Sequence, residues 1–71
     1  MQVFVLFSIS LSGPKIIGVF QDDLEAELTK FSLQSRNLVE DCFIQEENLP
    51  ENVSDDISYF SKLFWSRPEW H

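Results

Sequence analysis

The chain of 71 residues has room for one small domain, and its 12 acidic and 5 basic residues give a formal net charge of −7. Apolar residues make up 44% and aromatic residues 14% of the sequence, which predicts a folded domain rather than an acidic disordered tail. Five scattered cations exclude the basic stripe that a nucleic-acid binder needs. The single cysteine excludes an internal disulfide, and no Cys/His cluster indicates a zinc site.

The chain opens with an apolar segment, residues 3–9, that has the pattern of a central strand covered on both sides. Turn-forming residues at 10–14 separate it from a second short strand at 15–20. This pattern predicts a hairpin with a loop of about five residues. The first strand has two apolar faces, one made of Val3, Val5, Phe7 and Ile9 and the other of Phe4 and Leu6.

The same opening segment does not resemble a signal peptide, because no Lys or Arg precedes Lys15 and no small-x-small cleavage site follows. At about ten residues it is also too short to span a bilayer. Together with the unpaired thiol of Cys42, these features predict a cytoplasmic protein.

A helix is predicted over residues 22–36. Asp22 is placed as its N-cap, and Glu25 three residues later completes a capping-box pair. The apolar residues at i, i+4 and i+7 form one stripe, which we expect to lie against one face of the sheet. The stripe consists of Leu24, Leu28 and Phe31.

The second half of the chain predicts a third strand at 38–45, a polar linker at 46–53, a second helix from Ser54 or Asp55 to Trp65, and a tail at 66–71. Charges within the third strand favour an edge position. The second helix has its own apolar stripe, which we expect to cover the other face of the sheet. That stripe consists of Ile57, Phe60, Leu63 and Phe64.

These elements predict a single α+β domain over 1–71 with the order β-β-α-β-α. A three-stranded antiparallel sheet of order 2-1-3 places the two-faced strand in the middle, with one helix packed on the sheet and a C-terminal helix on the other side. A core of this size is marginal, so oligomerisation through the exposed strand edges is a further possibility.

Two strand motifs and a helix start carry a family resemblance. Val3-Phe4-Val5-Leu6-Phe7, then Ile16-Ile17-Gly18-Val19-Phe20, then an acidic helix start with Ala26 resemble a group of small uncharacterised β-β-α-β proteins of phages and bacteria with a "GVF" second strand. The resemblance covers about residues 2–47 and leaves out the second helix and the tail. It implies a phage-borne accessory context and no particular activity.

The sequence offers no convincing catalytic group and implies no cofactor or metal. The only histidine, His71, ends the sequence, and a domain this small rarely forms a pocket. Cys42 has no interior histidine to act as its base, so we interpret it as a small buried hydrophobe. Acidic pairs such as Asp22/Asp23 lack the spacing of a calcium loop. We therefore expect a protein that is not an enzyme.

Two groups of residues are candidates for binding a partner. The acidic group offers charge to a partner with a basic nucleic-acid-binding surface, either by mimicking phosphates or by steering. The C-terminal group contains the residue types that dominate interface hot spots, although both tryptophans could instead complete the core. The acidic group is Glu40, Asp41, Glu46, Glu47 and Glu51, and the C-terminal group is Tyr59, Trp65, Arg67 and Trp70.

These features favour a small acidic protein-binding module. In the phage context of the resemblance, it would inhibit or modulate a host protein such as a defence nuclease, acting by stoichiometric binding rather than by touching nucleic acid or membrane. Two alternatives remain open, which are an oligomeric sponge for a small ligand and an accessory or antitoxin-like subunit of a larger complex.

Overall fold

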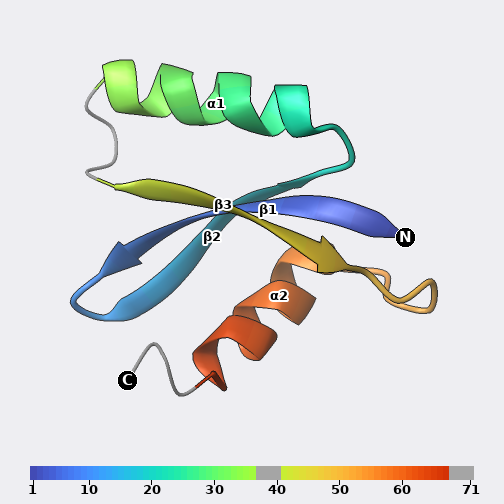
Figure 1. Cartoon of the computed structure of the whole chain (residues 1–71). Coiled ribbons are helices and arrows are strands. Elements are labelled where there is room, and N and C mark those ends of the chain that lie inside the picture. Colours follow the sequence, from blue (N-terminus) through green and yellow to red (C-terminus); the bar gives the residue numbers. More distant parts are fainter. Residues whose placement is uncertain (37–40, 68–71) are drawn as a thin grey trace.

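The computed structural model describes residues 1–36 and 41–67, and within them it confirms the predicted α+β class. The three strands form one antiparallel sheet of order β2-β1-β3. Helix α1 covers one face of this sheet and α2 the other (Figure 1). The elements are β1 (Gln2–Ser10), β2 (Gly13–Phe20), α1 (Asp23–Ser35), β3 (Cys42–Asn48) and α2 (Asp56–Trp65).

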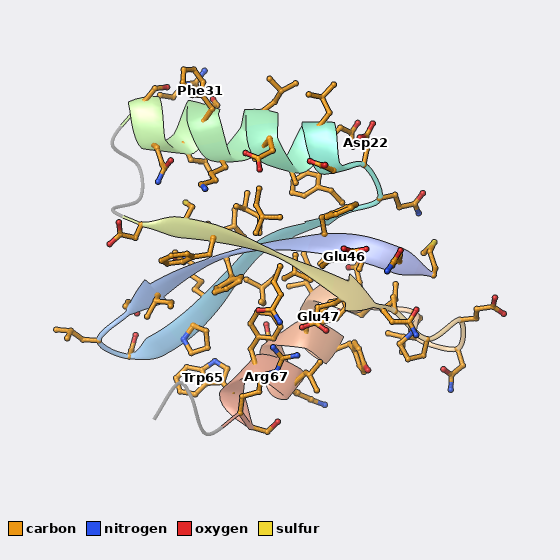
Figure 2. All side chains as sticks on the ribbon, viewed as in Figure 1. Asp22, Phe31, Glu46, Glu47, Trp65 and Arg67 are labelled. Atoms are coloured by element: carbon orange, nitrogen blue, oxygen red, sulfur yellow. The ribbon has the colours of Figure 1, made fainter. Side chains whose placement is uncertain are left out.

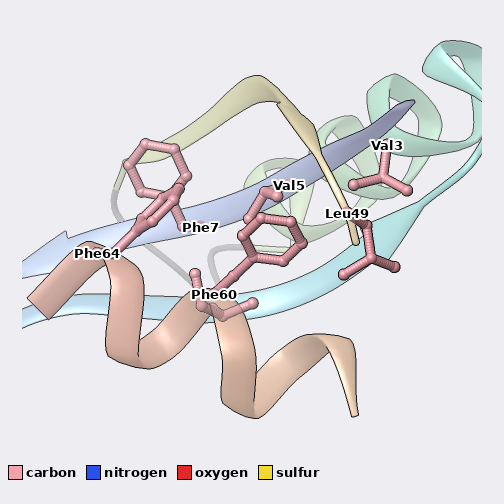
Figure 3. Packing of buried hydrophobic residues seen from close by; sticks show 7 residues of the cluster. Val3, Val5, Phe7, Leu49, Phe60 and Phe64 are labelled. Atoms are coloured by element: carbon pink, nitrogen blue, oxygen red, sulfur yellow. The ribbon is translucent and has the colours of Figure 1, made fainter. Parts of the chain in front are cut away.

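The main core lies between the sheet and α2 (Figure 3). Successive side chains of a strand point to opposite faces, so the odd-numbered residues of β1 face α2. Phe60 and Phe64 stand one helical turn apart, and both side chains are fully buried. The ring of Phe64 meets that of Phe7 edge to face, with the centroids 5.0 Å apart. The buried cluster consists of Val3, Val5, Phe7, Ile16, Leu49, Phe60 and Phe64.

The α1 side of the sheet is packed differently from the prediction. Ala26, a small residue, is fully buried there, and Leu6 and Cys42 are buried on the sheet side. The predicted stripe points away from the sheet, because the large side chains of the sheet leave room for alanine rather than leucine at the closest approach. Its members Leu24, Leu28 and Phe31 are 64%, 61% and 72% exposed.

The hairpin is tighter than predicted. β1 runs to Ser10 and β2 starts at Gly13, so the loop between the strands is two residues long rather than about five. Gly13 has φ +112°, a conformation that side chains rarely adopt, and it lets the chain reverse at this point. A register shift between Leu6 and Phe7 bulges the pairing with β2.

β3 lies at the edge of the sheet, as predicted, but it spans different residues and leaves out Asp41, one of the charges on which that prediction rested. It begins at Cys42 and continues to Asn48, so the linker predicted from Glu46 begins after Asn48. An edge strand accommodates the charged side chains at 46 and 47 because one of its sides is open to solvent. Part of the predicted strand, residues 38–40, lies outside the described residues.

The helix starts show which caps are used. Asp22 is the N-cap of α1, and its carboxylate accepts a hydrogen bond from the Leu24 amide at 2.9 Å. The N-cap of α2 is Asp55 rather than Ser54, and it accepts bonds from both the amide and the hydroxyl of Ser58. Ile57, predicted in the apolar stripe of α2, is exposed in the first turn of the helix.

Candidate protein-interaction surfaces

The acidic residues predicted to bind a partner do not form one patch. Glu46 pairs with Phe4 and therefore lies on the α1 side, whereas Glu47 pairs with Val3 and lies on the α2 side. Asp41 and Glu51 are exposed beyond the two ends of β3. The remaining predicted residue, Glu40, lies outside the described residues.

Glu47 and Arg67, both predicted as partner contacts, form an ion pair with each other. The Arg67 Nη2 atom is 2.5 Å from the Glu47 Oε1 atom, and the amide of Gln45 donates to the same oxygen at 2.8 Å. The guanidinium also lies 4.7 Å from the ring centroid of Phe64. This network joins the end of α2 to the edge strand (Figure 2), so its first role is structural.

The aromatic residues of α2 are divided between the core and the surface. Tyr59 packs against the core cluster, and its ring lies 5.0 Å from that of Phe60. Trp65 is 46% exposed, but the other part of its ring covers the hairpin turn so closely that a Cβ on Gly13 would lie 2.4 Å from a ring carbon. Trp70 is outside the described residues.

The outer face of α1 carries three exposed apolar residues that were predicted to lie in the core. Leu24, Leu28 and Phe31, which we call the α1 stripe, follow one another along the outer face of α1. Figure 2 shows Phe31 pointing away from the sheet. Ala26 lies on the opposite side of α1 and is fully buried. In the sequence, this small apolar residue marks the side of the helix that can approach the sheet closely.

Negative charge surrounds the molecule and is little neutralised. Among residues 1–36 and 41–67, the Arg67–Glu47 contact is the single ion pair. The beginning of α1 carries the densest group of acids in the described chain. The exposed carboxylates are those of Asp22, Asp23, Glu25, Glu27, Asp41, Glu46, Glu51 and Asp55.

Cys42 is a free cysteine, and its side chain is buried at the start of β3. Burial raises the pKa of the Cys42 thiol above its usual range, with Lys30 opposing this shift and Asp41 adding to it, so the sulfur is protonated and weakly nucleophilic at neutral pH. No group of three His, Cys, Asp or Glu side chains among the described residues is arranged to hold a metal ion. Neither helix has the length and apolar character to cross a membrane.

No family model matches the chain, and no curated protein or solved structure matches it.

Proposed function

We propose that this protein is a small acidic binding module that inhibits or modulates a partner protein with a basic, nucleic-acid-binding surface. It acts by stoichiometric binding and carries out no chemistry of its own. The observation that carries the proposal is the exposure of eight of the ten described carboxylates, and among these ten only Glu47 is neutralised by an ion pair.

Long-range attraction is the mechanism that this charge favours. A net charge of −7 on a domain with a radius of gyration of 12.0 Å produces a negative potential that extends about one Debye length, ~10 Å at 0.1 M salt, into solution. Such a field accelerates encounter with a basic surface and competes with phosphates for it. Occupation of a nucleic-acid groove would by itself inhibit the partner.

The proposal is tested by affinity capture from a lysate of the native host, followed by titration of the purified partner. We expect the affinity to fall as NaCl rises and duplex DNA to compete for the same site. Binding that is indifferent to NaCl, or a partner that binds its nucleic acid and this protein at once, would contradict the proposal.

A charge-reversal variant gives the second arm of this test. Glu46→Lys combined with Glu51→Lys reverses two exposed carboxylates and should weaken binding at low salt and flatten its salt dependence. The matched control is Asn52→Gln, next to Glu51 in the same exposed turn, which should bind as the wild type does.

A further inference from the structure

The outer face of α1 exposes more apolar surface than the fold requires. Three large side chains stand on consecutive turns and are each more than half exposed. The sheet-facing side of the helix is filled by other residues, with Ala26 fully buried. A helix that serves only to cover the sheet would place polar residues on its outer face. Contiguous exposed apolar residues with a polar rim mark interaction sites.

The charges beside the stripe specify what kind of surface fits it. With 3.6 residues per turn, Glu25 and Glu27 flank the stripe on opposite sides, and both are exposed. Lys30 lies towards the sheet and is half-buried, and Arg36 caps the far end of the helix. The stripe is therefore bordered by negative charge along its first two turns.

We propose that the α1 stripe binds an amphipathic helix of the partner whose apolar face is flanked by Lys and Arg. This inference rests on the proposed function and names the surface through which it acts. Leucine and phenylalanine at i, i+4 and i+7 present the ridge that packs into the grooves of another helix. Lysine or arginine on either side of that helix would meet Glu25 and Glu27.

A second copy of this chain fits the stripe less well. Each copy carries a charge of −7, and a parallel pairing would bring the flanking glutamates together. An antiparallel pairing would still bring together two molecules of the same net charge. A lipid surface is also a poorer fit, because membrane-bound helices carry cations beside the apolar face.

The probe for this site is a peptide of about 18 residues, long enough to form a helix, with a leucine stripe flanked by lysines. Two reference peptides share its length: one carries glutamate in place of lysine, and one has the same composition in an order without a stripe. We expect the leucine–lysine peptide to bind and to shift the methyl resonances of Leu24 and Leu28 and the ring resonances of Phe31. Equal binding of either reference peptide would overturn the proposal.

Variants separate the stripe from general charge attraction. Leu28→Gln with Phe31→Gln changes two exposed residues, so the fold should persist, and we expect at least tenfold weaker peptide binding. Leu11→Gln is the matched control, because Leu11 is an exposed apolar residue on the hairpin turn, and it should bind unchanged. Glu25→Gln with Glu27→Gln should weaken binding several-fold, whereas Glu51→Gln should not. Unchanged binding by the stripe variant overturns the site.

Two other results would show that the α1 stripe binds something other than a partner helix. Sedimentation showing a dimer that the stripe variant dissolves would make a second copy the occupant. Binding to phosphatidylcholine vesicles that the same variant abolishes would make it a membrane contact. If the captured basic partner binds the stripe variant as tightly as wild type, the proposed function stands and this docking site is wrong. If no basic partner exists, the function fails whatever the peptide does.

Discussion

At the level of single residues, Asp55 has the clearest dependence on pH. Hydrogen bonds from the Ser58 amide and hydroxyl hold the pKa of its carboxyl below its ordinary value of 3.8. A carboxyl whose pKa is lower in the folded state stabilises the fold fully above the unfolded pKa, and this contribution is lost as the pH falls through the folded pKa. The ionised side chain also suits the positive end of α2.

We therefore expect Asp55→Ala to lower the melting temperature most at neutral pH and progressively less as the pH falls below 3.8. Thermal melts followed by circular dichroism across this range measure the difference. Ser54→Ala is the control, because Ser54 is not the cap, and it should melt close to the wild type throughout. A difference between Asp55→Ala and wild type that does not change with pH would show that ionisation of Asp55 contributes nothing.

The contact between Gly13 and Trp65 makes a second prediction at this scale. Gly13→Ala is disfavoured both by φ +112° and by the indole that fills the space of a Cβ. The backbone effect alone is of order 1–3 kcal/mol, and the steric effect adds to it. In a Trp65→Ala background only the backbone part should remain, so the two substitutions should be strongly non-additive in urea unfolding. Additive effects would show that the indole does not cover the turn in solution.

At the level of elements, the two helices contribute very differently to the core. Phe60 of α2 is fully buried, whereas Phe31 of α1 is 72% exposed. Phe60→Ala should destabilise the fold by about 3–5 kcal/mol, because it removes buried apolar surface and leaves a cavity. Phe31→Ala should change the stability by less than about 0.5 kcal/mol. Urea unfolding of the two variants checks this, and a large loss with Phe31→Ala would place that ring in the core.

The same pair of helices shows how far sequence patterns reach. The apolar run of β1 identified the central strand, and the period of α2 identified Phe60 and Phe64, because most of the apolar residues in these patterns are buried. Ile9 and Ile57 are the exposed exceptions, at 43% and 46%. In α1 the apolar residues do recur with a helical period, but they lie on the outer face of the helix and not on the face that packs against the sheet. Which face a helix buries depends on the volume that the sheet offers, and this volume follows from the pairing of distant strands. For this reason the sequence pattern led us to predict that the residues of the candidate docking site would be buried in the core.

The acidic pair Glu46 and Glu47 illustrates a related limit. Adjacent charges in sequence indicated one acidic surface, but in β3 they point to opposite faces of the sheet, and only one of them pairs with Arg67. β3 extends to Asn48, so both glutamates belong to a strand, in which successive side chains point to opposite faces. In the predicted linker both side chains would have been exposed. These residues belong to a strand because they pair with β1. A pairing between segments so far apart in the chain cannot be predicted from the neighbouring residues alone.

At the level of the whole molecule, the net charge sets how stability responds to salt. The described chain has many exposed carboxylates and one ion pair, so repulsion exceeds attraction in the folded state. With a radius of gyration of 12.0 Å, charges on opposite sides interact when the Debye length is ~30 Å at 0.01 M salt, and much less when it is ~8 Å at 0.15 M. Unfolding separates the charges and relieves the repulsion.

We therefore expect the melting temperature to rise as NaCl increases from about 0.01 to 0.15 M, where screening rather than ion-specific effects dominates. A variant with Asp23→Asn, Glu46→Gln and Glu51→Gln, all exposed positions, should melt higher at low salt and respond less to added NaCl. A melting temperature that falls with salt would mean that favourable charge pairs outweigh the repulsion. In that case the carboxylates would already be engaged within the fold and would have little charge to offer a basic partner, so this measurement also bears on the proposed function.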